Sequence, residues 1–446
     1  MISEKILEAI EQQLIARELS SCERYIIAKS WEGDRYEKIA RESGYDKNYV
    51  KQVGAKLWSE LSSVTGKNIT KKNLRIVFEL PIKADRPKQT TQTRFEPTLN
   101  DVATEEINFP SSPVVANSSL YINRPPTEDL VYGEIERPGC LLRIEGARKI
   151  GKSSLLNKII AHASARQYAT VVIDFQEVEN SLLDNIDKLL QWFCTSISLQ
   201  TGLALDLNKH WQAEIGSKVS CKICLEDILK RLNCPVVIAI NELNRLFEYR
   251  EITKDFFSML RFWHERSKDN SLWQLRLVLV YSTDTYVRFN LNQSPIKVGL
   301  AIKLPLFTFA QTVELAKRYG LNLEFTEGGL VENIYQLLNG HPYLTSLAFY
   351  HLHRETITYQ QLIATAASPE GIFGSHLLNL LILLQSDRNL IADFKKAIAS
   401  ESAIFLNAIA ANKLKSLGLV EYEQGKVKPI CQLYCLYFRQ QLSSSY

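Results

Sequence analysis

Short apolar runs that alternate with amphipathic stretches place the strongest constraint on the fold of this chain. Five of them, rich in Val, Ile and Leu, occur between residues 140 and 306. They are CLLRIEG (140–146), ATVVIDF (169–175), PVVIAIN (235–241), LRLVLVYST (275–283) and AIKLPL (301–306). Continuous apolar runs suit strands that are buried on both faces, and the helical stretches between them supply the crossovers that parallel strands require. The sequence therefore predicts an α/β core, a parallel sheet with flanking helices, over residues 119–308.

The segment GARKIGKSS (146–154) follows the first apolar run and precedes an amphipathic helical pattern, SSLLNKIIAHA. It satisfies the spacing G-x-x-x-x-G-K-[ST], in which glycines let backbone N–H groups surround phosphate oxygens at a helix N-terminus. Lys152 would contact the β- and γ-phosphates, and the Ser153 hydroxyl would bind Mg²⁺. The sequence thus predicts a P-loop that binds ATP or ADP. Its residues are Gly146, Ala147, Arg148, Lys149, Ile150, Gly151, Lys152, Ser153 and Ser154.

The run PVVIAIN ends at Asn241, and Glu242 follows it directly. A P-loop normally works with an acid at the tip of another buried strand, which holds the metal ion through water. Asn241 occupies that metal-side position, but its amide brings no negative charge. Glu242 is the candidate catalytic carboxylate that would polarise the attacking water. Slow hydrolysis and binding with almost no turnover both stay open, and the second is favoured.

Two further polar motifs have alternative interpretations. Ser282, Thr283 and Asp284 end the fourth apolar run, where they would either reach the γ-phosphate or cap the next turn. His341 and Pro342 lie in GHPYL, which suits a helix start beside a flat base or an ordinary turn between helices.

Helical and irregular segments flank the predicted core. YEKIARESGYDKNYVKQVGAKLWSEL (36–61) has the apolar spacing of a helix-turn-helix, with its turn at Gly44, and predicts such a module over residues 1–80. Residues 81–118, rich in Pro, Ser, Thr and Asn, predict a flexible linker. A helical lid is expected over 309–366. Residues 367–446 are expected to form a winged-helix-like domain with a hairpin that turns at Gln424-Gly425.

Charge is concentrated in the N-terminal module. The whole chain carries only +4, but residues 35–75 contain ten Lys and Arg and four acids, and ten minus four leaves +6. Lys47, Asn48 and Lys51 begin the expected second helix, where base edges and phosphates would be met. Helix-turn-helix folds also serve as protein adaptors, so DNA and a protein partner both stay open.

The 446-residue sequence shows no membrane or export signal. No run approaches the ~18 apolar residues that a membrane-spanning helix needs. The N-terminus, MISEKILEAIEQQ, lacks the apolar core of a signal peptide. A cytoplasmic location without a membrane partner is therefore expected.

Together these motifs resemble a known family. The chain is similar to the bacterial AAA-like ATPases of the STAND group (signal-transduction ATPases with numerous domains). Many of these carry an N-terminal helix-turn-helix module named for its association with von Willebrand A and MoxR systems. In the N-terminal module the resemblance rests on SWEGDRYEKIARESGYDKNYVKQVGAKLWSELSSVTGKNITKKN (30–73). Elsewhere it rests on YINRPP (121–126), GARKIGKSSL (146–155), INELNRLFE (240–248), DFFSMLRFWHE (255–265), LRLVLVYSTDTY (275–286), NQSPIKVGL (292–300), NGHPYL (339–344), KLKSLGLV (413–420) and LYCLYF (433–438).

The resemblance implies roles for particular residues. Tyr121, Ile122 and Arg124 would approach the base and ribose. Ser282 or Thr283 would sense the phosphate, and His341 with Pro342 would close over adenine. The family typically has acids where this chain has Asn241 and Asn244, so the departure puts hydrolysis in doubt.

The resulting expectation is an ATP- and Mg²⁺-binding signalling switch whose nucleotide state controls presentation of its helix-turn-helix and winged-helix modules. Two alternatives remain. One is a DNA-binding regulator with a vestigial nucleotide site, and the other is an active ATPase that assembles into homo-oligomeric rings.

Overall fold

The computed structural model describes residues 21–31, 34, 36–43, 47–65, 69, 71, 107–267, 272, 274–288, 297–321 and 329–443. The chain forms two compact units, Met1–Leu99 and Asn100–Tyr446.

The described part of the first unit consists of helices α2 (Ser21–Trp31), α3 (Tyr36–Ser43) and α4 (Lys47–Thr65). Ile39 of α3 and Val50 and Leu57 of α4 are completely buried, as the helical apolar spacing predicts. The Trp58 indole N–H donates to the Tyr36 hydroxyl at 2.8 Å and ties α4 to the start of α3. The predicted helices are thus confirmed, whereas the expected turn at Gly44 lies outside the described residues.

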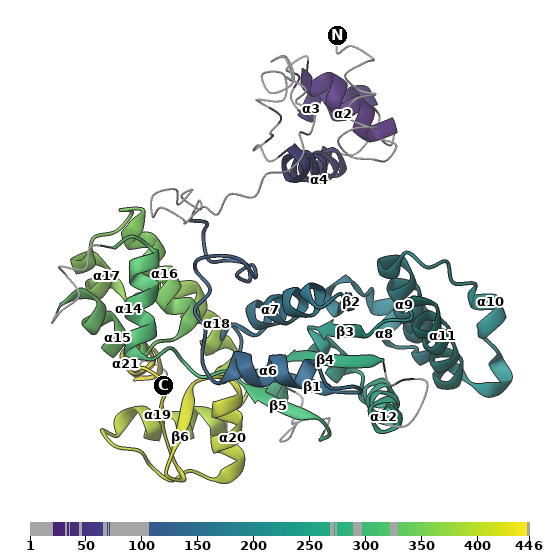
Figure 1. Cartoon of the computed structure of the whole chain (residues 1–446). Coiled ribbons are helices and arrows are strands. Elements are labelled where there is room, and N and C mark those ends of the chain that lie inside the picture. Colours follow the sequence, from purple (N-terminus) through teal and green to yellow (C-terminus); the bar gives the residue numbers. More distant parts are fainter. Residues whose placement is uncertain are drawn as a thin grey trace, which may run out of the picture. The chain divides into compact units, whose positions relative to one another are not determined.

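A five-stranded parallel sheet forms the centre of the second unit, in the order β2-β3-β4-β1-β5 (Figure 1). The parallel sheet predicted from the apolar runs is confirmed. The strands are β1 (Leu141–Gly146), β2 (Ala169–Asp174), β3 (Val236–Asn241), β4 (Leu275–Ser282) and β5 (Leu300–Lys303). The last predicted run extended to residue 306. Strand β5 stops earlier, just before Pro305, which has no N–H to donate to a ladder.

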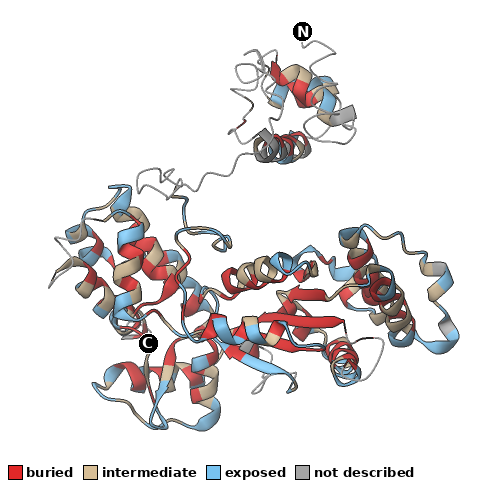
Figure 2. Cartoon of the chain, viewed as in Figure 1, coloured by how far each residue is buried: buried red, intermediate tan, exposed pale blue. Residues whose placement is uncertain are grey.

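Both faces of the sheet are covered, so the inner strands β1, β3 and β4 are buried along most of their length, whereas the edge strands β2 and β5 are more exposed (Figure 2). Ile238 and Ile240 of β3 pack on one face with helices α9, α11 and α12, while Val237 and Ala239 pack on the other with α6 and α7. The α-helices of this layer are α6 (Thr127–Ile135), α7 (Lys152–Ala165), α8 (Asn180–Leu183), α9 (Ile186–Thr201), α10 (Leu207–His210), α11 (Ser217–Leu232), α12 (Arg250–Arg266) and α13 (Thr285–Arg288). The described residues of this layer also form the 3-10 helices η2 (Phe175–Glu177), η3 (Ala213–Ile215) and η4 (Leu243–Glu248).

The C-terminal part of the second unit is mainly helical. Its elements are α14 (Phe309–Arg318), α15 (Leu330–Leu338), α16 (Pro342–His353), α17 (Tyr359–Thr365), α18 (Gly374–Gln385), α19 (Arg388–Ala399), α20 (Ala408–Ser416), β6 (Val420–Glu423), β7 (Lys426–Pro429) and α21 (Gln432–Ser443). Strands β6 and β7 form an antiparallel hairpin, and Gln424 and Gly425 both have positive φ, 50° and 82°. The predicted hairpin turn is confirmed, since two positive φ values are typical of the tight turns that join such strands. One hydrophobic core extends from α14 to α21.

None of the helices in the described ranges combines the length and the apolar character needed to cross a bilayer.

Candidate nucleotide site

The loop between β1 and α7 has the conformation that an anion cradle needs. Strand β1 ends at Gly146, and α7 begins at Lys152 with Gly151 as its N-cap. Lys149 and Gly151 have positive φ, 63° and 97°. A Cβ atom on Gly151 would also lie 3.0 Å from an Arg124 guanidinium nitrogen. A side chain at position 151 would therefore be disfavoured both by the positive φ and by its contact with Arg124, which accounts for the second glycine of the motif.

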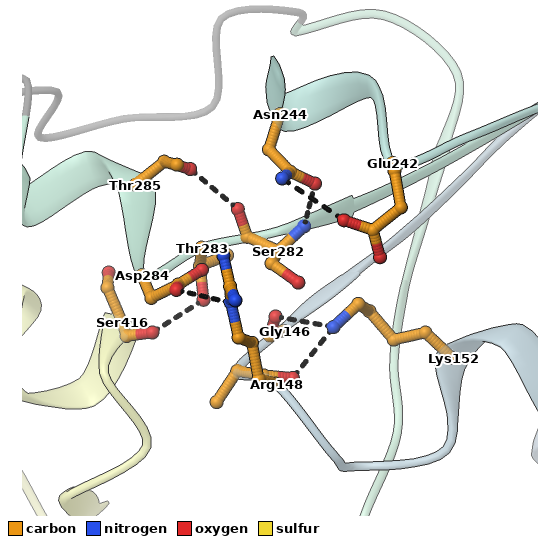
Figure 3. Close-up of polar contacts among 11 residues, drawn as sticks. Gly146, Arg148, Lys152, Glu242, Asn244, Ser282, Thr283, Asp284, Thr285 and Ser416 are labelled. Carbon is orange, nitrogen blue, oxygen red and sulfur yellow. Dashed lines mark hydrogen bonds and ion pairs between the residues drawn. The ribbon is translucent and has the colours of Figure 1, made fainter. Parts of the chain in front are cut away.

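Lys152 is buried within this loop and bonds to its backbone. Its amine donates to the carbonyl oxygens of Gly146 at 3.1 Å and Ala147 at 2.7 Å (Figure 3). Burial lowers the pKa of Lys152 from 10.5 to about 8, against the opposing effect of the carboxylates of Glu242 and Asp284. A positive charge is thus held in the loop, ready to exchange carbonyl partners for phosphate oxygens.

The lowered pKa of Lys152 predicts a pH dependence of nucleotide affinity. Phosphates would stabilise the protonated amine, so bound nucleotide would raise the pKa above about 8. Below pH 8 the amine is already protonated and affinity should be constant. Above it, binding must take up a proton and affinity should fall by up to about tenfold per pH unit. Calorimetric titration with ATP at pH 8.5, in two buffers of different ionisation enthalpy, measures that uptake. Zero uptake would contradict the lowered pKa.

Two residues at strand ends, Glu242 after β3 and Ser282 of β4, line the same cavity as Lys152 (Figure 3). Glu242 follows β3 and begins η4 with φ of 51°. Its carboxylate accepts a hydrogen bond from the Asn244 side-chain N–H at 3.3 Å, and the Asn244 carbonyl oxygen accepts from the Ser282 backbone N–H at 2.9 Å. Asn244 therefore positions Glu242 relative to the end of β4. An acid at position 244 could not donate to Glu242 and would repel it.

Asn241 and Asp174 end the neighbouring strands β3 and β2. The Asn241 side-chain N–H donates to a carboxylate oxygen of Asp174 at 2.7 Å. The other side-chain atom, Asn241 Oδ1, is buried and has no hydrogen-bond partner among the described residues. Such an acceptor is suited to a water molecule held by a cation, and Ser153 lines the same cavity. The residues present therefore fit Mg²⁺ bound together with nucleotide phosphates.

These groups surround a cavity of about 590 Å³. Its lining combines the P-loop, three strand tips, the segment before α6 and the start of α16. The lining residues are Pro110, Ser111, Ser112, Pro113, Val114, Leu120, Tyr121, Ile122, Arg124, Arg148, Lys149, Gly151, Lys152, Ser153, Ser154, Asp174, Gln176, Asn241, Glu242, Ser282, Phe307, Pro342, Tyr343 and Ser346. A volume in this range is typical of small-molecule sites.

Tyr121, Ile122 and Arg124, which the family resemblance assigns to the base and ribose, line this cavity. Buried Glu128 holds two of them: it accepts from the Tyr121 hydroxyl at 2.9 Å and from the Arg124 backbone N–H at 2.8 Å. The Arg124 guanidinium donates to the P-loop carbonyl of Ile150 at 3.0 Å. This segment is thus fixed against the P-loop.

Residues 109–114, here called the strap, lie against the P-loop helix although they belong to the stretch predicted as a linker. The Val114 backbone N–H donates to the Ser154 hydroxyl, and the Val114 carbonyl accepts from the Asn157 side chain, both at 3.0 Å. At the other end of the strap, the Phe109 ring makes an edge contact with Tyr350 of α16. The strap therefore connects α7 with α16.

His341 and Thr283 differ from the other site candidates. His341 is buried outside the cavity lining and accepts from the Leu344 N–H as N-cap of α16. Burial lowers its pKa to about 3, so its ring is neutral at neutral pH. The next residue, Pro342, does line the cavity. At the tip of β4, Ser282 faces the cavity, whereas the Thr283 hydroxyl donates to the Ser416 carbonyl at 2.8 Å.

The C-terminal part approaches the P-loop closely at this point. Gly418, just after α20, has φ of 76°, and a Cβ atom there would lie 2.6 Å from Ala147 Cβ. With the Thr283–Ser416 hydrogen bond, this contact joins the C-terminal part to both the P-loop and the tip of β4.

Of the N-terminal candidates for DNA contact, Lys47 forms an ion pair with Glu37 at 2.9 Å, and Lys51 is exposed. The Asn48 side chain lies outside the described part.

Sequence reasoning missed Asp174, the strap and Gly418. Asp174 is the second-last residue of a run that was recognised as a strand, so comparison of the strand tips could have found it. The other two depend on contacts between distant segments.

A parallel sheet with a P-loop after β1, and a carboxylate after a nearby strand, defines a P-loop ATPase fold. The chain belongs to the AAA-like domain family, whose model matches residues 109–440. Residues 1–80 match the model of the vWA-MoxR associated protein N-terminal helix-turn-helix.

Among solved structures, a Walker-type ATPase has a similar fold. The Walker-type ATPase of Pyrococcus abyssi is 16% identical, with a TM-score of 0.52 over 74% of this chain and 99% of that one. The ORC2 protein of Aeropyrum pernix is 15% identical, with a TM-score of 0.40 over 76% of this chain and 98% of that one. No curated protein matches the chain.

Proposed function

We propose that this protein is an ATP-binding regulatory switch. ATP with Mg²⁺ would occupy the cavity, and nucleotide state would control how the N-terminal helix-turn-helix module and the C-terminal part are presented to DNA or a protein partner. The observation that supports this most is the composition of the cavity wall. The P-loop, the strap and the start of α16 all contribute to it, so one ligand would touch all three.

Communication with the C-terminal part would pass through the contacts behind the P-loop. Ala147 lies against Gly418, and its carbonyl accepts the hydrogen bond from Lys152. When the Lys152 amine turns to phosphate, Ala147 loses that bond. The strap would transmit the effect of nucleotide binding towards the N-terminal module, because its Val114 backbone N–H donates a hydrogen bond to the Ser154 hydroxyl of the P-loop motif.

Hydrolysis would be slow in this proposal. Glu242 is positioned by Asn244 and can accept a hydrogen bond from an attacking water, but the adjacent amide of Asn241 brings no charge to the metal side. Turnover would therefore reset the switch slowly, which suits a regulator better than a motor.

Limited proteolysis tests the switch. Added ATP and Mg²⁺ should change the rate of cleavage within residues 340–446, because the ligand alters the contacts of α16 and of the segment around Gly418. The Lys152→Ala variant serves as control and should show one digestion pattern with and without ATP. An identical pattern for the unmodified protein in both conditions would indicate a static scaffold.

A further inference from the structure

The acid that the family places at the end of β3 is replaced by Asn241, yet a carboxylate lies directly beside it. Asp174 and Asn241 are in register on the parallel strands β2 and β3. Both line the cavity, and the amide donates to the carboxylate at 2.7 Å. The negative charge is therefore one strand away from the usual position.

This hydrogen bond fixes the orientation of the Asn241 amide. An ionised carboxylate only accepts hydrogen bonds, so the NH₂ group of Asn241 must face Asp174. Its Oδ1 atom then points elsewhere, and that is the buried atom without a partner among the described residues. A buried acceptor left unpaired is costly, so this geometry favours a donor that arrives with the ligand, such as a metal-bound water.

Asp174 is also held firmly in place. Its second carboxylate oxygen accepts from the Gln176 backbone N–H at 2.8 Å. Arg245 of η4 donates to the carbonyl oxygens of Phe175 at 2.6 Å and Val178 at 3.0 Å. The segment after β2 is thus tied to the segment after β3, and the Asp174–Asn241 pair cannot separate easily.

We infer that Asp174 supplies the carboxylate charge on the metal side of this nucleotide site, with Asn241 as the positioning residue that links it to the metal's water shell. The inference rests on the proposed binding of ATP with Mg²⁺. Asp174 supplies charge for metal binding, but it acts through the Asn241 amide from the neighbouring strand, so turnover stays slow. An acid at position 241 would instead bring two carboxylates together at hydrogen-bonding distance, where they repel each other unless a cation or proton lies between them.

The dissociation constant of a fluorescent ATP analogue, measured on the full chain in EDTA and in MgCl₂, tests this assignment. The unmodified protein should bind more tightly in MgCl₂. Asp174→Asn keeps an acceptor for Gln176, can still pair with Asn241 and removes a negative charge near the phosphates, so its affinity in EDTA should equal or exceed that of the unmodified protein. In MgCl₂ its affinity should fall about tenfold, the lower end of what loss of an outer-shell metal partner costs.

Two further variants sharpen the result. The exchange variant Asp174→Asn/Asn241→Asp returns one carboxylate to the pair and should recover most of the Mg²⁺-dependent affinity. Glu177→Gln removes an exposed acid three residues along the chain and should behave as the unmodified protein. Equal gains from Mg²⁺ in the unmodified protein and Asp174→Asn would overturn the assignment and leave ATP binding intact. Absence of ATP binding by the unmodified protein in either buffer would overturn the proposed function, and this assignment with it.

Discussion

Replacing Lys152 with Ala is expected to weaken ATP binding at least about a hundredfold. Its buried amine makes two hydrogen bonds to loop carbonyls that phosphate oxygens would replace. Two charge-assisted hydrogen bonds at about 1.5 kcal/mol each give about 3 kcal/mol, which corresponds to that factor in affinity. Equilibrium titration with a fluorescent ATP analogue measures the loss.

Lys230→Ala is the matched control for this variant. Lys230 is an exposed lysine of α11, a helix on the opposite face of the sheet from α7, and its loss should leave affinity unchanged. Thermal unfolding of both variants shows whether the fold is intact. A folded Lys152→Ala protein with undiminished affinity would mean that nucleotide binds elsewhere.

Gly418→Ala is expected to destabilise the protein by about 2–5 kcal/mol. A left-handed backbone costs a non-glycine residue about 1–2 kcal/mol, and overpacking a close contact costs about 1–3 kcal/mol more. Both apply at Gly418, where φ is 76° and the added Cβ would lie 2.6 Å from Ala147 Cβ. Denaturant unfolding monitored by circular dichroism gives the free energy of unfolding.

Gly425→Ala separates the two costs. Gly425 has a similar φ of 82°, but a Cβ atom there meets no other atom within 4 Å. Gly425→Ala should therefore lower the free energy of unfolding only by the backbone cost, about 1–2 kcal/mol. Ala147→Gly, introduced into Gly418→Ala, removes the clash and should restore stability in a double-mutant cycle. Equal decreases in the free energy of unfolding for Gly418→Ala and Gly425→Ala would show that Gly418 is not closely packed against Ala147 of the P-loop.

Features that depend on contiguous residues could be predicted from the sequence. The strands follow from continuous apolar runs, and the P-loop occupies nine consecutive positions between one of them and a helix, GARKIGKSS. The hairpin turn at Gln424-Gly425 is equally local, because those two residues alone provide the positive φ values. In each case the local sequence and the final packing favour the same structure.

Features that depend on distant segments could not be predicted in this way. The strap is rich in Pro and Ser without helical or strand periodicity, so its composition resembles a linker even though Val114 and Phe109 make defined contacts. The pairing of Asp174 with Asn241 requires β2 and β3 to be neighbours in register. Strand order is set by the packing of the whole sheet, which no single segment encodes.

Calorimetric titration of the purified 446-residue chain with ATP and MgCl₂ tests most directly whether the cavity beside Lys152 is a nucleotide site. We expect saturable binding of one ATP per chain, with affinity that decreases above about pH 8 and is at least about a hundredfold weaker in Lys152→Ala. Heats indistinguishable from dilution, at protein concentrations up to the solubility limit, would contradict it.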